Sequence, residues 1–326
     1  TVMAGKMEII ALEEHYLDPE LKPHFRGNDE TRQQDVVLRL DDVGALRLKE
    51  MDEAGIDFQV LSHAAPSLQK LDAETAARLA RGVNDRLAET VKAHPDRFAA
   101  FAALPTPDPK TAADELERTV TRLGFKGAMV HGLTNGLFLD DQRFWPVFER
   151  AAALDVPLYL HPSAPHPAVI AAYYQDYVAR FPMILRAAWG FTVETATQGI
   201  RLILSGAFDK YPRLKIILGH LGEGLPFYLW RINMALGRAG NAVLSSEGKT
   251  FRDYFCEHFY ITTSGFFSDP ALLCCMMEVG IDRILFSVDY PFVANPPGTK
   301  WLETLPICAE DKAKLLNGNA RRLLKL

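Results

Sequence analysis

The chain has 326 residues, a formal net charge of −5 and 48% hydrophobic residues, which is the composition of a globular protein with a large core. The slight acidity gives no reason to expect nucleic acid or an anionic membrane surface as a partner. No apolar run approaches the ~18 residues of a membrane-spanning helix, and the four cysteines, which lack zinc-ribbon or disulfide spacing, are expected to be reduced thiols of a cytoplasmic protein.

In chain order, residues 1–6 come first and are expected to be a leader or a tag remnant, since they show no signal-peptide pattern. Short apolar runs rich in β-forming residues then alternate with segments of helical spacing. The predicted strands are 8–12, 58–62, 98–104, 127–131, 157–161, 215–220, 259–264 and 283–289. The predicted helices are 46–54, 73–94, 111–123, 141–154, 192–208 and 270–279.

This alternation predicts an α/β fold with a parallel sheet, and the number of strands favours a closed (β/α)₈ barrel of the TIM type over an open sheet. No Gly/Ser linker or low-complexity tract divides the chain, so we expect a single domain over residues 1–326. Two stretches, 17–43 and 163–189, are too long for plain connections. Insertions at the C-terminal face of such a barrel commonly shape the substrate pocket.

The first apolar run ends in Leu12-Glu13-Glu14-His15. If this segment is a strand, Glu13 and His15 share one face and Glu14 faces the other way. A carboxylate and an imidazole side by side are half of a site for Zn²⁺ or a similar divalent ion. The triplet is a weak signal by itself, because it occurs by chance in many chains. Glu14 is expected not to bind the metal.

Three later strands also end on a group that can bind a metal or transfer a proton: His161, His220 and Asp289. Each has a plain alternative, since His161 and Asp289 precede turn-forming residues and His220 can cap a helix. The active sites of (β/α)₈ barrels, however, lie at the C-terminal ends of the strands. Burying unpaired polar groups also costs free energy. Together with Glu13 and His15, these residues therefore predict a metal-centred site at that end of the barrel.

The remaining histidines are less informative. His63 and His131 also close predicted strands, and the sequence does not decide between a pocket-lining and a structural role for them. His24 lies in the first insertion and is a candidate to reach the site. The histidines expected in loops or at the surface, with structural roles, are His94, His166 and His258.

These residues together resemble a known family, the amidohydrolase-related nonoxidative decarboxylases. This family includes γ-resorcylate (2,6-dihydroxybenzoate), 2,3-dihydroxybenzoate, 5-carboxyvanillate and aminocarboxymuconate-semialdehyde decarboxylases. The resemblance is carried by Glu13-x-His15, His161-Pro162, Gly219-His220-Leu221-Gly222-Glu223 and Phe286-Ser287-Val288-Asp289-Tyr290-Pro291-Phe292. It covers nearly the whole chain, with further matching stretches at 84–88, 95–98, 123–128, 230–233, 261–265 and 319–323.

The resemblance implies one divalent metal ion per subunit, Zn²⁺ or Mn²⁺, and places His220, paired with Glu223, beside it. It implies that Arg231 reaches a substrate pocket, often across the subunit interface of a homodimer or homotetramer. It also implies that Phe191 packs on the substrate ring. The metal ligands that it implies are Glu13, His15, His161 and Asp289.

Three departures from the family pattern concern the substrate. His131 stands where hydroxybenzoate decarboxylases usually carry an Asn near the substrate, and His63 replaces an uncharged residue. Residues 293–297 lack an acidic residue that is common there. The sequence therefore indicates the reaction class more firmly than the identity of the acid. The residues expected to contact the substrate are Arg231, Phe191, His131, His63 and Tyr290.

The expected reaction is loss of CO₂ from an ortho-hydroxylated aromatic acid. Because a ring carbanion is poorly stabilised, the ring carbon is expected to be protonated before CO₂ leaves. In this hypothesis the metal binds the carboxylate and an ortho oxygen of the substrate, and Asp289 is the general acid. His220, oriented by Glu223, assists at the phenol, while Phe191 and Tyr290 exclude water.

Two other functions remain open from the sequence. A hydrolase, either a lactonase or an amidohydrolase, would use the same ligands to activate a water molecule, with His220 as general base. A non-catalytic binding protein built on an inactive barrel is disfavoured by the complete set of ligands. Release of CO₂ from hydroxybenzoates would distinguish a decarboxylase from a hydrolase.

Overall fold

The computed structural model describes residues 6–29 and 32–326. Most of the expected leader, residues 1–5, lies outside the described residues. Lys6 lies within them, and its Nζ is 2.9 Å from the carboxylate of Asp57, the residue that precedes the second strand. Lys6 therefore contacts the fold.

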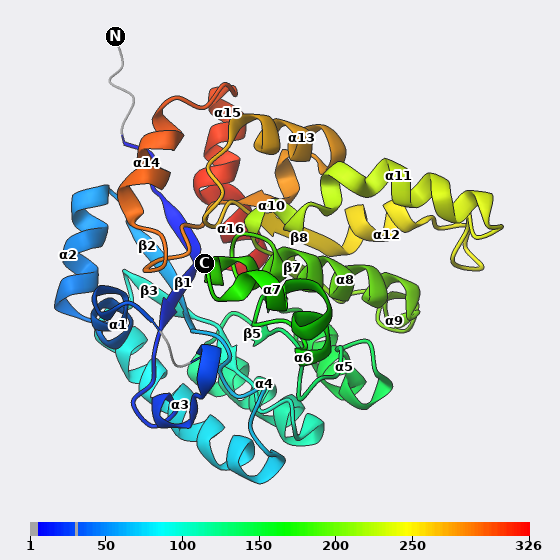
Figure 1. The fold of residues 1–326 in the computed structure, drawn as a ribbon. Coiled ribbons are helices and arrows are strands. Elements are labelled where there is room, and N and C mark those ends of the chain that lie inside the picture. The colour runs from blue at the N-terminus through cyan, green and yellow to red at the C-terminus, as the bar shows by residue number, and fades with distance from the viewer. Residues whose placement is uncertain (1–5, 30–31) are drawn as a thin grey trace.

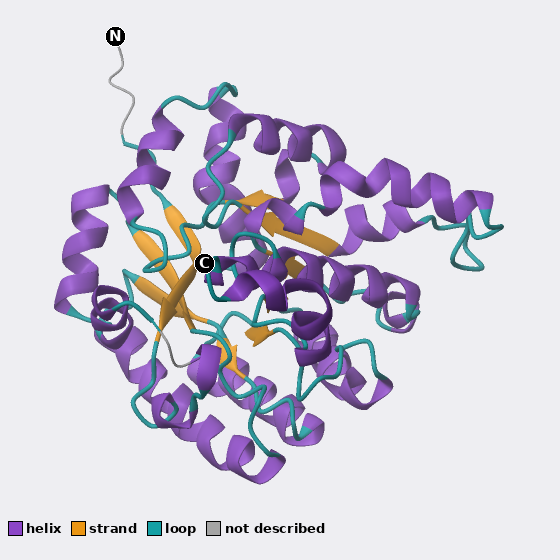
Figure 2. Cartoon of the chain, in the orientation of Figure 1, coloured by secondary structure: helices purple, strands orange, loops and turns teal. Residues whose placement is uncertain are grey.

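Short parallel strands occupy the centre of the molecule, and helices surround them (Figures 1 and 2). Strands β1–β3 form one sheet and strands β4–β9 form another, each with its strands in chain order. The strands are β1 (Ile10–Tyr16), β2 (Phe58–His63), β3 (Phe98–Ala100), β4 (Ala102–Ala103), β5 (Ala128–His131), β6 (Leu158–His161), β7 (Ile216–Leu218), β8 (Phe259–Thr262) and β9 (Ile284–Leu285). Each predicted strand overlaps an observed one, and the predicted third strand is divided at Phe101 into β3 and β4.

The two ends of this strand series meet. The N–H of His15 in β1 donates to the carbonyl of Tyr290 at 2.7 Å, and the N–H of Asp289 donates to the carbonyl of Glu13 at 3.1 Å. A parallel bridge also joins Glu14 to Tyr290. The predicted α/β fold of the TIM-barrel type is confirmed.

The last strand is shorter than predicted because its continuation bonds to side chains. The N–H of Ser287 donates to Thr263 Oγ1 at 3.1 Å, and the N–H of Val288 donates to Glu14 Oε1 at 2.9 Å. These acceptors replace the carbonyls of a neighbouring strand, so β9 ends at Leu285. The first strand, in contrast, continues beyond its predicted end and pairs with β2 as far as Tyr16.

An irregularity in β1 determines which of its side chains face the barrel interior. Leu12 and Glu13 both lie opposite Val60 of β2, where a regular strand would place one residue. Such a bulge reverses the alternation of side chains beyond it. Ile10 and Leu12 therefore pack in the inner cluster with Val60, and Glu13, not Glu14, continues the inward face.

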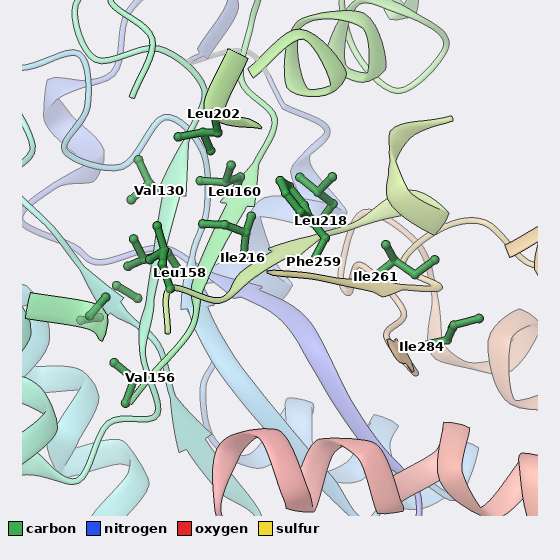
Figure 3. Close-up of a cluster of buried hydrophobic side chains, with 14 of the residues drawn as sticks. Val130, Val156, Leu158, Leu160, Leu202, Ile216, Leu218, Phe259, Ile261 and Ile284 are labelled. Atoms are coloured by element: carbon green, nitrogen blue, oxygen red, sulfur yellow. The ribbon is translucent and has the colours of Figure 1, made fainter. Parts of the chain in front are cut away.

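Alternation on the other strands separates two apolar layers. Leu158 and Leu160 of β6 lie in the layer between strands and helices (Figure 3), whereas Tyr159 packs inside the barrel. Ile216 of β7 likewise lies in the outer layer. Because side chains alternate, His161 is on the same inner face as Tyr159, at the C-terminal end of β6.

The helices vary widely in length, and none in the described residues combines the length and apolarity that crossing a membrane requires. They are α1 (Gln34–Asp41), α2 (Ala45–Ala54), α3 (Ala73–Ala93), α4 (Pro109–Leu123), α5 (Trp145–Leu154), α6 (Pro167–Val169), α7 (Gln175–Val178), α8 (Gly190–Leu204), α9 (Ala207–Lys210), α10 (His220–Glu223), α11 (Leu225–Arg238), α12 (Phe251–His258), α13 (Asp269–Val279), α14 (Asn295–Glu303), α15 (Ala309–Ala313) and α16 (Asn319–Leu324). Shorter 3₁₀ or π turns are η1 (Lys22–His24), η2 (Gly27–Asp29), η3 (Gln142–Phe144), η4 (Ile170–Tyr174), η5 (Pro182–Leu185), η6 (Ile281–Arg283) and η7 (Lys314–Gly318).

The two long insertions contain short helical segments. The first holds η1, η2 and α1, and the second holds α6, η4, α7 and η5, of which α6 and α7 lie over the middle of the molecule in Figure 1. The sequence pattern predicts no helix for α11, although it is a regular one. Three of its aromatic side chains, Phe227, Tyr228 and Trp230, are exposed, which removes the usual contrast between an apolar and a polar face. His258, expected in a loop or at the surface, is instead buried in α12.

Replacing Gly127 with alanine tests the close approach of β5 to β6. Gly127 has φ +141°, and a Cβ there would lie 2.3 Å from the carbonyl oxygen of Pro157. We expect Gly127→Ala to lower the free energy of unfolding by about 3 kcal/mol, because the backbone must move to relieve the contact with Pro157. In the control Gly124→Ala, nothing lies within 4 Å of the new Cβ, so only the left-handed φ of +74° opposes it, at about 1 kcal/mol. Urea unfolding measures the free energy of unfolding of both variants. Equal losses of stability would contradict the steric argument.

Candidate metal centre and active site

Four side chains from three places in the chain meet at the C-terminal end of the barrel. Two come from β1, one from the end of β6 and one from the segment after β9. One ligand atom from each lies within 4.8 Å of all the others. We call these residues the four-residue cluster: Glu13, His15, His161 and Asp289.

The contacts within the four-residue cluster are short. Glu13 Oε1 lies 3.2 Å from His161 Nε2 and 3.6 Å from His15 Nε2. Asp289 Oδ1 lies 3.2 Å from His15 Nε2. Glu13 and His15 are fully buried, so water does not screen these charges.

Three of these atoms lack a hydrogen-bond partner among the described residues although they are buried: Glu13 Oε1, His15 Nε2 and Asp289 Oδ1. Burying such groups without partners is unfavourable. The Nδ1–H of His161 donates to the carbonyl of Pro162 at 2.6 Å, which leaves the Nε2 lone pair of His161 free to bind a metal. Two imidazole nitrogens and two carboxylate oxygens around one point suit a divalent cation such as Mn²⁺ or Zn²⁺. The residues present therefore fit such an ion.

The pKa shifts within the cluster show that its carboxylates stabilise a nearby positive charge. Burial alone would raise the pKa of Glu13, but the imidazoles of His220, His15 and His161 hold it well below its usual range. Burial lowers the pKa of His15, but Asp289 and Glu13 outweigh this effect and raise it to about 9. The two carboxylates thus favour a protonated imidazole beside them. A divalent cation would supply that positive charge when it binds.

The second oxygen of Glu13 is held by hydroxyl groups. Ser264 Oγ donates to Glu13 Oε2 at 2.8 Å, and the Tyr159 hydroxyl also donates to it. The Tyr159 hydroxyl in turn lies 2.7 Å from Thr262 Oγ1. A Cβ at Gly219 would lie 2.5 Å from the same Glu13 oxygen, so only glycine fits there. These contacts direct Oε1 of Glu13 toward the other cluster residues.

His220 lies beside the cluster in an unusual turn. Its Nδ1 is hydrogen-bonded to Glu223 Oε1, and its Nε2 lies 3.6 Å from Glu13 Oε1 and 3.7 Å from Asp289 Oδ2. Burial would lower the pKa of His220, but the charges of Glu223 and Glu13 and the nearby carboxylate of Asp289 raise it well above its usual value. All five residues from 220 to 224 have positive φ, so α10 is a left-handed turn. Such strain is concentrated at functional sites, where surrounding contacts maintain it.

The structure places the two undecided histidines differently. His63 accepts the N–H of Asp18 through Nε2 at 2.9 Å and donates from Nδ1 to the carbonyl of Ala64 at 2.8 Å. Both nitrogens of His63 are therefore used by backbone, which supports the structural alternative. His131 is buried, and its Nδ1 lies 3.1 Å from Nδ1 of His161. Burial and the neighbouring imidazoles hold the pKa of His131 well below its usual value.

Tyr290, Phe191 and Arg231, also expected at the substrate, lie outside the four-residue cluster. The Tyr290 hydroxyl donates to Glu50 at 2.6 Å and its ring lies 4.8 Å from the guanidinium carbon of Arg47, so the side chain packs toward α2. Phe191 is half-buried in the first turn of α8. Arg231 is exposed on α11.

Some residues at the site were not predicted. The ring of Phe292 lies 5.6 Å from that of His15, and the guanidinium carbon of Arg32 lies 5.9 Å from the centre of the same ring. Phe292 is the last residue of the motif at 286–292, but nothing in the sequence indicated the direction of its side chain. Tyr159 had a usable signal, since it precedes His161 by two residues and a strand places both on one face.

Removing the hydroxyls that hold Glu13 should weaken metal binding. For Tyr159→Phe and Ser264→Ala we expect a roughly 10- to 100-fold higher dissociation constant for Mn²⁺, because the ligand loses its orientation. Competition with a chelator of known affinity measures it. Tyr254→Phe is the control, because that buried hydroxyl bonds to Asp209 away from the cluster. Unchanged affinity in both test variants would contradict the orienting role.

Known proteins match this chain and its fold closely. The amidohydrolase family model matches residues 19–326. The γ-resorcylate decarboxylase of Polaromonas sp. (strain JS666) is 42% identical over 332 residues, 99% of each chain. The crystal structure of 2,6-dihydroxybenzoate decarboxylase complexed with 2,6-dihydroxybenzoate has a TM-score of 0.88 and 41% identity, covering 98% of this chain and 100% of that one. The dihydroxybenzoic acid decarboxylase from Polaromonas sp. JS666, with bound manganese and the inhibitor 2-nitroresorcinol, has a TM-score of 0.87 and 42% identity over 98% of both chains.

These similarities confirm the predicted resemblance, the fold class and the prediction of a decarboxylase. The bound manganese of one neighbour and the four-residue cluster together support a single divalent metal ion. The family match begins after Glu13 and His15, so it is the geometry that brings these two residues to the site. The protein is a metal-dependent carboxy-lyase, and its chain belongs to the amidohydrolase family.

Proposed function

We propose that this protein removes CO₂ from 2,6-dihydroxybenzoate or a closely related ortho-hydroxylated aromatic acid. The observation that carries this proposal is the four-residue cluster, with three unpartnered ligand atoms facing one point and the His220–Glu223 pair beside it. The identity of the substrate is supported by relatives of matching length that are named for this acid.

The metal ligands are Glu13, His15, His161 and Asp289. When bound, the divalent ion supplies Lewis-acid stabilisation to the anionic oxygens at the reacting end of the substrate. We assign Mn²⁺ as the ion, with Zn²⁺ as the alternative, because a solved neighbour holds manganese and the mixed oxygen and nitrogen donor set accepts both.

The proton that the reaction needs is held by His220 and transferred by Asp289. Burial would raise the pKa of Asp289, but the neighbouring imidazoles of His15 and His220 lower it, so this carboxylate does not keep a proton at neutral pH. His220, whose pKa is raised, carries the proton, and its Nε2 lies 3.7 Å from Asp289 Oδ2. Asp289 thus receives the proton from one side and delivers it to the substrate on the other, as a general acid.

The chemical step then follows from protonation. The proton adds to the ring carbon that carries the carboxylate, and the ortho hydroxyl oxygen stabilises the positive charge that develops in the ring. The carbon–carbon bond to the carboxylate breaks, and its electron pair restores the aromatic ring as CO₂ leaves. The product is a phenol with hydrogen in place of the carboxylate.

The substrate ring is held by Phe292 and Phe191 and recognised by His131. Nδ1 of His161 carries the hydrogen that it donates to the carbonyl of Pro162, so it cannot accept one from the facing Nδ1 of His131, and the proton of His131 is on Nε2. His131 therefore offers a neutral N–H donor to an oxygen substituent on the ring. An Asn in this place would also offer an N–H donor.

The enzyme acts as a homodimer or homotetramer in which Arg231 serves a neighbouring subunit. Arg231 is exposed on α11 and makes no hydrogen bond or ion pair within the described residues. Around it, Phe227, Tyr228 and Trp230 are 75%, 51% and 67% exposed, an aromatic surface typical of an interface. In a neighbouring pocket the guanidinium would hold a substrate oxygen by a charge-assisted hydrogen bond.

The whole chain forms a single barrel domain and acts in the cytoplasm. Contacts between β1 and the segment after β9 support one domain, because they join the first strand of the series to the segment that follows the last. The four cysteines are all free, which suits a reducing compartment.

A CO₂-release assay tests the reaction. With Mn²⁺ bound, we expect turnover of 2,6-dihydroxybenzoate, none of 3,5-dihydroxybenzoate, which lacks an ortho hydroxyl, and loss of activity after chelation that added Mn²⁺ restores. Metal content is measured on the same samples. Metal-loaded protein that releases no CO₂ from any ortho-hydroxybenzoate but cleaves lactones or amides would establish the hydrolase instead.

Asp289→Asn tests the proton transfer. We expect turnover to fall roughly 10²- to 10⁴-fold, because the amide cannot carry the proton, while substrate binding is largely retained. Metal content and substrate binding are measured beside turnover. Asp282→Asn is the control, since that exposed carboxylate pairs with Lys314. An active Asp289→Asn enzyme would eliminate Asp289 as the proton donor.

A further inference from the structure

Glu14, the residue between two cluster ligands, is fully buried and has its own set of partners. Its Oε1 accepts the N–H of Val288 at 2.9 Å, and its Oε2 accepts the N–H of Tyr290 at 3.0 Å. These two N–H groups flank Asp289 in sequence. One carboxylate therefore holds the backbone on both sides of a cluster residue.

The backbone around Asp289 needs such support. Asp289 has φ +74°, a left-handed conformation that is unfavourable for a residue other than glycine. The strand before it ends at Leu285, so the buried N–H groups of Val288 and Tyr290 have no strand partner. Without Glu14 both donors would be buried and unpaired, which is unfavourable.

Two backbone hydrogen bonds complete the connection in the opposite direction. The N–H of Asp289 donates to the carbonyl of Glu13 at 3.1 Å, and the N–H of His15 donates to the carbonyl of Tyr290 at 2.7 Å. Residues 13–15 and 288–290 are thus joined by four hydrogen bonds, two of them to Glu14. With this backbone in place, Asp289 Oδ1 lies 3.2 Å from His15 Nε2.

Arg47 of α2 packs against the backbone segments that Glu14 joins. It is fully buried, it donates to the carbonyl of His15 and to Gln59 Oε1, and its guanidinium carbon lies 4.8 Å from the ring centre of Tyr290. The attraction between Glu14 and Arg47 opposes the effect of burial on the arginine pKa.

We propose that Glu14 is a positioning residue that sets the place of the Asp289 carboxylate, and so tunes metal affinity and proton transfer without touching metal or substrate. The proposal rests on the metal site and proton path proposed above. It also gives the second glutamate of the Glu13-Glu14-His15 run a role distinct from that of the first.

Glu14→Gln is the direct test. Both oxygens of a carboxyl group keep a lone pair for an N–H, with or without a proton, whereas the amide nitrogen of glutamine cannot accept one. We expect the dissociation constant for Mn²⁺ to rise at least 10-fold and kcat to fall at least 10-fold, with KM changed less than 3-fold. Electron paramagnetic resonance of the bound Mn²⁺ should show altered coordination.

A matched control separates positioning from general destabilisation. Glu115→Gln removes a carboxylate of similar burial on α4, where it bonds to Asn84 and Arg118. This variant should lose stability while keeping wild-type Mn²⁺ affinity and spectrum. Wild-type affinity and kcat in a folded Glu14→Gln protein would overturn the proposal, as would an equal loss of affinity in Glu115→Gln.

Should Glu14→Gln not fold, Glu14→Asp replaces it, because the shorter acid keeps the charge but cannot span both N–H groups. An affinity for Mn²⁺ at least 3-fold weaker supports the proposal, and unchanged affinity overturns it. The metal measurement does not depend on turnover. Wild-type protein that binds Mn²⁺ but releases no CO₂ would refute the proposed function and leave the affinity comparison valid.

Discussion

The pairing of residues 13–15 with residues 288–290 is the constraint on which the barrel and the site both depend. The backbone hydrogen bonds of this pairing, at 2.7 and 3.1 Å, bring the two ends of the strand series together. The side chains of the same residues supply Glu13, His15 and Asp289 to the cluster. A slip of one residue in this pairing would turn side chains to the opposite face, so the metal site exists only in this register.

Electrostatics explains why so many charges are tolerated in a buried place. Buried ions are unfavourable unless opposite charges and hydrogen bonds compensate them. Glu13, Asp289 and Glu223 carry three negative charges here, and a divalent ion together with a protonated His220 would cancel them. The hydroxyls of Tyr159 and Ser264 add hydrogen bonds to Glu13 without adding charge. The site is therefore arranged for an ion.

Much of the fold and the centre of the site follow from local pattern. Alternating apolar runs and helical spacing predict the strand order, and polar residues at strand ends predict a metal-centred site, for which the family resemblance implies the four ligands. The outer parts of the site do not follow in this way. The sequence did not indicate that the Tyr290 side chain packs against Arg47 and bonds to Glu50, because side-chain direction after Asp289 depends on a left-handed backbone. α11 was missed because its exposed aromatics hide the helical pattern.

The sequence by itself determined the barrel class, the residue types at the strand ends and the grouping of Glu13 with His15. Only the tertiary structure shows how this pair, and not Glu14, comes to face the interior together with Ile10 and Leu12. Strict alternation from Leu12 would point Glu14 inward. The bulge opposite Val60 reverses the phase, and it exists because β1 must pair with β2 and with residues 288–290 at once. Such a demand comes from partners distant in the chain, which local sequence does not contain.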